Sequence, residues 1–83
     1  MRKDLLNVLN YNKCIKVKFK TKSGTIREME CTRDLEAIPK FQHEGINNPK
    51  LNGPLICCVY DWTNTDFRAF RWDSVLDWEI VTE

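Results

Sequence analysis

An unbroken apolar run, residues 55–60, constrains the fold of this chain more than any other stretch. The run is too short for a helix core and is bounded by Pro54 and Asp61, which is typical of a strand buried on both faces. After a polar turn the chain returns as a second, largely apolar segment, residues 67–72. We therefore predict that these two segments form the central hairpin of a small β domain.

The length and composition fit one folded domain, which we assign to residues 1–83. A hydrophobic content of 42% with 30% charged residues is that of an ordinary folded protein rather than a disordered one. No apolar run approaches the roughly 20 residues that a membrane helix needs. The N-terminal pattern of charges and broken apolar patches does not predict a signal peptide, so we expect a cytoplasmic protein without a membrane partner.

The cysteine spacing argues against a metal site or a disulfide framework. Cys57 and Cys58 are adjacent on a predicted strand and should point to opposite faces, and no CxxC motif is present. The one histidine, His43, is distant in sequence from every cysteine pair. We expect Cys14, Cys31 and the adjacent pair to be small buried hydrophobes, with no cofactor.

Residues 14–20 alternate between apolar side chains and lysines, which predicts a half-buried strand. The following strand is expected at residues 25–31. A three-residue turn ending at Gly24 pairs Val17 with Met29 and keeps the apolar residues on one face, whereas a two-residue turn would mix the faces. The three-residue turn is therefore the predicted register.

This register has consequences for the charged residues. It sets lysines opposite glutamates on the solvent face, in the pairs Lys18–Glu28 and Lys16–Glu30. It also places Arg27 opposite Phe19, on the apolar face. Because an unpaired charge is not tolerated in a core, we expect Arg27 at the open end of the sheet with a partner.

The segments around the hairpins are less regular. Asp4 can cap a short N-terminal helix, the alternative being an extended arm; the inward residues of that helix would be Leu5, Leu6 and Leu9. Residues 34–39 can form one helical turn with Leu35 and Ile38 facing inward. Residues 40–53 are rich in Asn, Gly and Pro and predict a loop, either a functional lid or a mobile connection.

The second hairpin is predicted to turn at Asn64, which pairs Tyr60 with Arg68. One face would then hold Ile56, Cys58, Tyr60, Arg68, Phe70 and Trp72. A turn at residues 73–75 leads to a last strand whose inward residues would be Leu76, Trp78 and Ile80. Five strands in this order predict an all-β fold, a small five-stranded SH3-like or Sm-like barrel with a short N-terminal helix or arm.

The second half of the chain also resembles the end of WYL domains. There, a strand ending in Tyr-Asp leads through a turn into Arg-x-Phe-Arg-x-Asp and an aliphatic residue. The matching residues here are Tyr60, Asp61, Arg68, Phe70, Arg71, Asp73 and Val75. Together with KVKFKTKSGTIREMECT, this region is similar to a family of small bacteriophage WYL-like proteins with an Sm-like, SH3-like barrel, over roughly residues 14–80. The tripeptide that names the WYL family would fall at residues 55–57 and is absent.

The resemblance implies a barrel fold and an association with ligand sensing and nucleic-acid binding. It also implies that Arg68 occupies one of the ligand-facing basic positions of WYL domains. The remaining basic cluster of those domains has no counterpart that can be mapped onto this sequence. The resemblance therefore bears more on the fold than on the function.

Basic residues are the main candidates for a binding site. Residues 1–27 hold eight Lys or Arg and one acid, whereas residues 28–83 hold five Lys or Arg and eleven acids. Arg27 and Arg68 would form a fork for phosphate or carboxylate if they converge at one barrel mouth; the alternative is that each pairs with an internal acid such as Asp61 or Asp73. Four lysines lie along the first predicted strand and its turn: Lys16, Lys18, Lys20 and Lys22. They form either a track for phosphate groups or a solvated face that neighbouring glutamates neutralise.

Aromatic residues are a second group of candidates. Tyr60 and Trp62 could stack on bases, and Trp62, in the turn, is the one expected to be an exposed platform. No pairing of a nucleophile with a histidine, Gly-rich phosphate loop or metal-spaced carboxylate set is present, so we predict a protein without enzymatic activity.

We thus expect a binding module that takes nucleic acid or a nucleotide-like anion. The alternative is a protein that inhibits or modulates a host bacterial enzyme or defence factor through Trp62, residues 40–54 or a sheet edge. A structural oligomer of barrels joined at their edges is the third possibility. If the chain is phage-encoded, it would act in the host cell cytoplasm.

Overall fold

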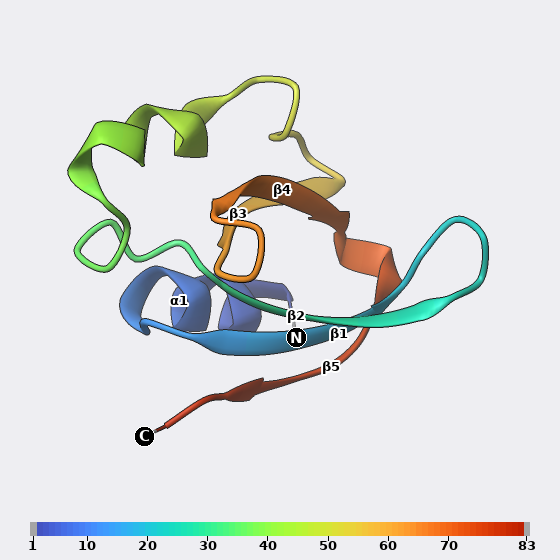
Figure 1. Cartoon of the computed structure of the whole chain (residues 1–83). Helices are drawn as coiled ribbons and strands as arrows, with labels where there is room; N and C mark the ends of the chain where they lie inside the picture. Colours follow the sequence, from blue (N-terminus) through green and yellow to red (C-terminus); the bar gives the residue numbers. More distant parts are fainter. Residues whose placement is uncertain (1, 83) are drawn as a thin grey trace.

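A single five-stranded antiparallel sheet forms the centre of the molecule in the computed structural model, which describes residues 2–82, with side chains from residue 4 onward (Figure 1). The elements are α1 (Arg2–Tyr11), β1 (Ile15–Lys20), β2 (Ile26–Thr32), the 3-10 helix η1 (Lys40–Asn47), β3 (Ile56–Asp61), β4 (Asp66–Arg71), the 3-10 turn η2 (Trp72–Ser74) and β5 (Val75–Ile80). The strand order is β4-β3-β2-β1-β5. This is the small, barrel-like all-β fold that the sequence predicts, and the N-terminal segment is a helix rather than an arm.

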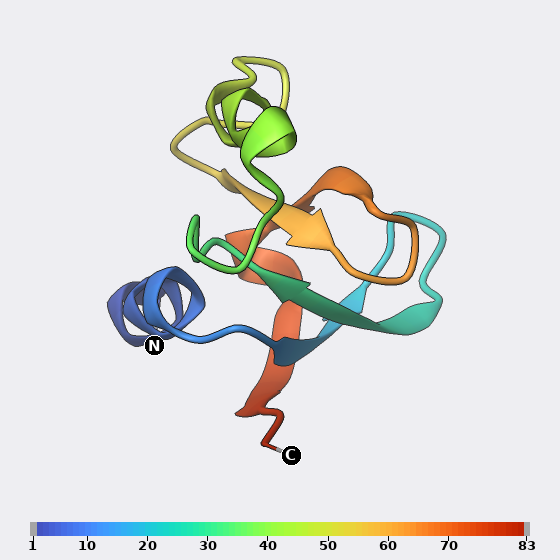
Figure 2. The ribbon, with the colours of Figure 1, turned by 60° about the vertical axis from the view of Figure 1, so that its left-hand side comes forward.

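The sheet bends sharply between β2 and β3. These strands pair at only two positions, Cys31 with Asp61 and Thr32 with Tyr60. The two hairpins therefore diverge from a short common seam, and Figures 1 and 2 show β3 and β4 folded over the layer made by β1, β2 and β5. The bend leaves the two hairpins facing each other across a concave surface.

The predicted register of the first hairpin is confirmed. Val17 pairs with Met29 and Phe19 with Arg27. The amide of Thr21 donates to the carbonyl of Thr25 at 2.8 Å, which closes the three-residue turn. Gly24 in that turn has a φ of 87°, in the left-handed region that favours glycine.

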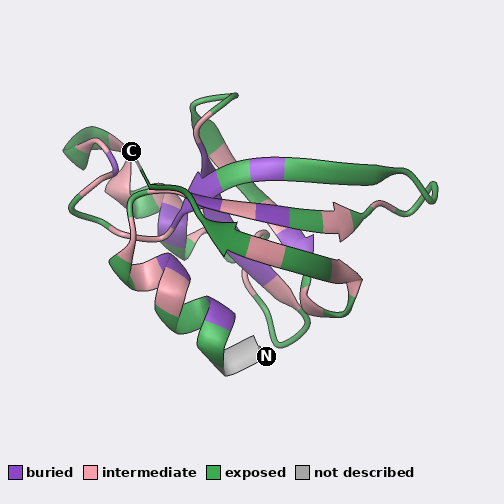
Figure 3. Cartoon of the chain, turned by 90° about the horizontal axis from the view of Figure 1, so that it is seen from below, coloured by how far each residue is buried: buried purple, intermediate pink, exposed green. Residues whose placement is uncertain are grey.

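Helix α1 packs its apolar side against the concave face of the sheet. Leu5 and Leu9 are buried in one cluster with Val17, Val59 and other strand residues, and Figure 3 shows the buried positions gathered where the helix meets the strands. The expectation that Leu6 also faces inward is wrong, since this side chain is 36% exposed. Leu5 and Leu9 lie one turn apart, whereas Leu6 is rotated away from their side of the helix.

The end of α1 is tied to the end of β2. The amide of Arg33 donates to the carbonyl of Leu9 at 2.9 Å, and the hydroxyl of the buried Thr32 donates to the carbonyl of Asn12 at 2.6 Å. Carbonyl groups that a helix end leaves without helical partners are thus satisfied by the next layer. No helix among residues 2–82 is long and apolar enough to span a membrane.

The other face of β3 is covered by the connection between the hairpins. The prediction of a loop over residues 40–53 is wrong for its first part, because η1 occupies Lys40–Asn47. Tyr60, on β3, is buried beneath η1 and donates from its hydroxyl to Gln42 Oε1 at 3.0 Å. In the preceding turn Ile38 is buried as expected, whereas Leu35 is 44% exposed, so its predicted inward position is wrong.

The register of the second hairpin differs from the prediction by one residue. Tyr60 pairs with Phe67, and Arg68 pairs with Val59. The turn holds four residues, 62–65, and Thr65 adopts a φ of 50°. Arg68 consequently shares the face of Val59 and the main core rather than the face of Tyr60.

Strand β5 contains an irregularity that alters its faces. Lys18 pairs with Asp77 but Phe19 pairs with Val75, so the register shifts and Leu76 has no partner in the ladder. Trp78 packs against the core as predicted, together with Val75. The predicted inward positions of Leu76 and Ile80 are wrong, because these side chains are 50% and 45% exposed.

Gly45 is required for the contact between η1 and β4, and this can be tested by substitution. A Cβ at this position would lie 2.3 Å from the ring of Phe67. We expect Gly45→Ala to lower the free energy of unfolding by about 1–3 kcal/mol in urea denaturation, since the ring and the helix would have to separate. The control is Gly53→Ala, whose Cβ would lie 3.6 Å from Ile56 Cγ1. Equal stability of the two variants would contradict this packing.

Candidate functional site

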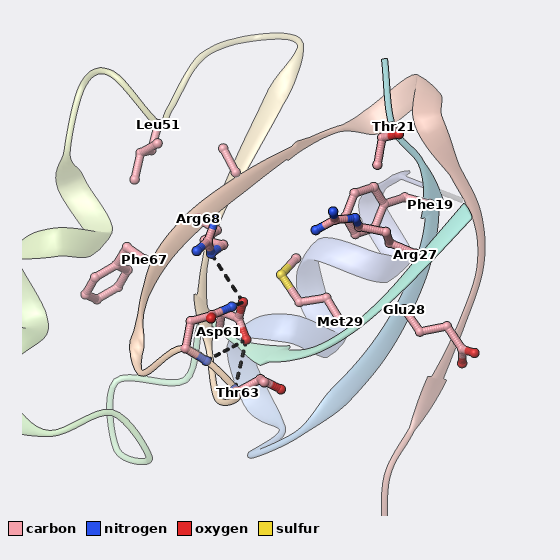
Figure 4. A pocket seen from close by; sticks show the side chains of 12 residues that line it. Phe19, Thr21, Arg27, Glu28, Met29, Leu51, Asp61, Thr63, Phe67 and Arg68 are labelled. Carbon is pink, nitrogen blue, oxygen red and sulfur yellow. Dashed lines mark hydrogen bonds and ion pairs between the residues drawn. The ribbon is translucent and has the colours of Figure 1, made fainter. Parts of the chain in front are cut away.

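A cleft with a volume of about 610 Å³ opens on the concave side, between the first and second hairpins (Figure 4). Its polar lining includes Arg27 from β2 and Arg68 from β4, and its apolar lining includes Phe19, Met29 and Phe67. Figure 4 shows the two guanidinium groups on opposite sides of the hollow, with the Met29 side chain between them. The two arginines that the sequence analysis considered as a possible fork thus line one hollow, from opposite sides.

Arg68 is held at the edge of the cleft by an ion pair. Its Nε lies 3.4 Å from Oδ2 of Asp61, and the Arg68 side chain is 56% exposed while that of Asp61 is only 5% exposed. The predicted alternative, pairing with an internal acid, therefore applies to Arg68. Within the described part of the chain, neither terminal nitrogen of this guanidinium donates a hydrogen bond. The ion pair leaves that edge of the side chain accessible from the cleft.

Asp61 organises the turn as well as the arginine. Its Oδ1 accepts from the amide of Thr63 at 2.9 Å, and its Oδ2 accepts from Nδ2 of Asn64 at 2.6 Å. A buried carboxylate needs such donors, because burial without them would cost several kcal/mol or so. The carboxylate of Asp61, at the end of β3, is therefore stabilised by the turn and by Arg68.

Arg27 differs from Arg68 in having no acidic neighbour at ion-pair distance among residues 4–82. It is exposed and lies opposite Phe19 at the open end of the sheet, as predicted. The partner expected for it is not found among residues 4–82. Glu28 also lines the cleft, but Figure 4 shows its carboxylate directed away from both guanidiniums. Arg27 therefore supplies a positive charge that no described acid neutralises by direct contact.

The lysines of β1 divide into two groups. Lys16 lies between Glu30 and Glu79 in the sheet, and its Nζ is 3.8 Å from the latter carboxylate. Lys18 is flanked in the same way by Glu28 and Asp77. Each of these two lysines thus lies between two acidic residues of the neighbouring strands. This arrangement favours the alternative of a neutralised solvent face over a continuous phosphate track.

Lys20 and Lys22 lie outside these rows. Together with Arg71 they line a second cleft, which shares Phe19 and Thr21 with the first. Arg71 is already bound to Asp73, at 3.0 and 3.1 Å, and this pairing lowers the pKa of the Asp73 carboxyl. Of the four predicted lysines, the structure therefore brings two next to the arginine cleft.

The two predicted aromatic residues do not line the cleft. Tyr60 is on the opposite face of β3, where it is buried under η1. Trp62 is half-buried, stacks edge-to-face on Tyr60 at 5.2 Å and donates from Nε1 to the carbonyl of Lys13 at 2.8 Å. The expectation of Trp62 as an exposed platform is wrong, because its ring packs on Tyr60 and is bonded to the segment between α1 and β1. Phe67, which the sequence analysis did not select, borders the cleft, although its ring packs against Tyr60 and η1 on the other face of the second hairpin.

The four cysteines, all in the described part of the chain, form no disulfide, and three of them are buried. Burial raises the pKa of Cys31, and burial also raises that of Cys58 against the opposing effect of Arg33. Among the described residues, no group of three His, Cys, Asp or Glu side chains is placed to hold a metal ion.

Asp61 is the site residue whose importance sequence reasoning underestimated. The sequence indicates it only as a position that matches the WYL pattern and as a possible partner for an arginine. A usable signal was nevertheless present, since an aspartate directly after a buried strand and before a Thr-Asn turn is well placed to bond the turn amides. Comparison with models of protein families, with curated protein sequences and with solved structures gives no match.

The raised thiol pKa values predict a pH dependence of stability. Above the ordinary thiol pKa of 9.0 the unfolded chain loses protons that folded Cys31 retains, so folding stability should fall as pH rises. We expect the free energy of unfolding to decline between about pH 8 and about pH 10, and to decline less in Cys31→Ala. The difference between the two profiles isolates this thiol, because every other group is the same in the wild type and in the variant. Identical pH profiles would contradict the burial of this thiol.

Proposed function

We propose that this protein is a non-enzymatic binding module that takes nucleic acid or a nucleotide-like anion in the cleft between Arg27 and Arg68. The observation that carries the proposal is the convergence of two guanidiniums from separate hairpins on one hollow. Of these two arginines, only Arg68 is paired with an acid among residues 4–82. Guanidinium groups bind phosphate and carboxylate through paired N–H donors, so this arrangement favours an oxyanion.

The walls of the cleft support a ligand with a flat apolar part. The ring of Phe19 is half-buried and therefore retains accessible surface in the cleft, where it lies opposite Arg27 in the sheet. Aromatic rings of this kind stack on bases, while hydroxyl and amide groups such as those of Thr21 and Asn64 can bond polar edges. The adjoining cleft with Lys20 and Lys22 would extend the basic surface along a longer ligand.

A second candidate function is binding to a host bacterial protein, as an inhibitor or modulator. The observation that favours it is Phe41 on η1, which is 87% exposed. Aromatic side chains on a surface are frequent anchors of protein interfaces. This candidate uses the η1 face of the molecule rather than the arginine cleft. The proposed setting for both functions is the cytoplasm of a phage-infected bacterium.

The first function is tested by charge reversal in the cleft. We expect Arg27→Glu to weaken binding of a labelled single-stranded oligonucleotide by about tenfold or more, and to reduce the slope of log K against log salt by about one. Fluorescence anisotropy over a range of salt concentrations measures both quantities. The matched control is Lys40→Glu, the same charge change at an exposed position on η1. Equal losses in the two variants, or no binding by the wild type, would contradict the proposal.

A further inference from the structure

The guanidinium of Arg68 forms an ion pair with Asp61 on its Nε side, and its terminal nitrogens bond no described residue. The closest approach to Asp61 is through Nε, at 3.4 Å. A guanidinium carries five N–H donors in a rigid plane, so an acid on the Nε side leaves the two terminal nitrogens as a separate fork. That fork belongs to a side chain that is 56% exposed and lines the cleft.

Asp61 is itself held by its neighbours. It is 3% exposed, and its carboxylate is held by the amide of Thr63 and the side chain of Asn64. An arginine side chain otherwise has many rotamers, and fixing one of them costs up to about 2 kcal/mol of side-chain entropy. An anchored carboxylate that has already oriented the arginine removes part of this cost from ligand binding.

We infer that Asp61 is a positioning residue that presents the terminal fork of Arg68 to an oxyanion with two available oxygens, such as a phosphate group. This inference rests on the proposed function and specifies how the site recognises its ligand. Bidentate binding selects an oxyanion over a spherical ion such as chloride, because only the former matches both N–H groups. Arg27, across the cleft, adds charge but has no anchored orientation of this kind.

A positioning role for Asp61 and simple electrostatics predict opposite changes in anion affinity when Asp61 is replaced. Asp61→Asn removes a negative charge beside an anion site, which by Coulomb attraction alone would tighten anion binding. If Asp61 positions Arg68, the same substitution weakens binding, because an amide in place of Oδ2 turns a donor toward the Nε–H of Arg68. We expect about tenfold weaker binding of dimethyl phosphate to Asp61→Asn.

The experiment is a double-mutant cycle with Arg68→Lys, which keeps the charge and removes the fork. Dissociation constants come from backbone-amide NMR shifts on titration with dimethyl phosphate, methyl phosphate or chloride, and the same spectra show whether each variant is folded. Asp61→Asn should weaken binding of both phosphates in the wild-type background and not in the Arg68→Lys background. The two phosphates distinguish a backbone diester from a terminal phosphate, and chloride should not compete.

The outcomes separate the two hypotheses. Saturable phosphate binding by the wild type that becomes tighter in Asp61→Asn would overturn the role of Asp61 and leave the proposed function intact. Equal weakening in both backgrounds would also overturn it, since general loosening of the turn would then explain the loss. No saturable binding of either phosphate by the wild type would overturn both the positioning role and the proposed function.

Discussion

Burial of β3 on both faces is the constraint on which the rest of the structure depends. Its residues alternate between the main core, which α1 closes, and a second layer, which η1 closes. A strand that is apolar at nearly every position has to be covered on both faces, because each large apolar side chain left exposed would lose about 1.5–3 kcal/mol of hydrophobic stabilisation. This requirement explains why an 83-residue chain carries a long connection between its hairpins: the connection is the second cover.

The candidate site follows from the way this strand ends. Asp61 continues β3 and is buried with it, so its carboxylate has to be satisfied within the protein. The turn that follows donates hydrogen bonds to it, and Arg68 on the returning strand forms an ion pair with it. The short seam between β2 and β3 then bends the sheet, and this bend brings Arg27 to the opposite side of the same hollow. The ion pair that stabilises the buried Asp61 carboxylate thus also places the Arg68 guanidinium at the edge of the cleft.

The sequence predicted those parts of the fold in which pattern and turn chemistry agree. In the first hairpin, strict alternation and Gly24 define one register, and that register placed Arg27 correctly. The second hairpin could not be resolved in this way, because β3 has no polar alternation to fix its faces. Its register depends on the bonds of Asp61, which exist only in the folded turn. The shift at Leu76 and the covering position of η1 likewise depend on tertiary packing.

The central claim is that Arg27 and Arg68 act together on one anion. The most direct measurement follows the side-chain Nε–Hε NMR signals of both arginines during a titration with a short single-stranded oligonucleotide. The account predicts that the two signals shift along one saturable curve with a common dissociation constant. It is contradicted if the two signals saturate independently, or if neither moves while amides around Lys16 and Lys18 do.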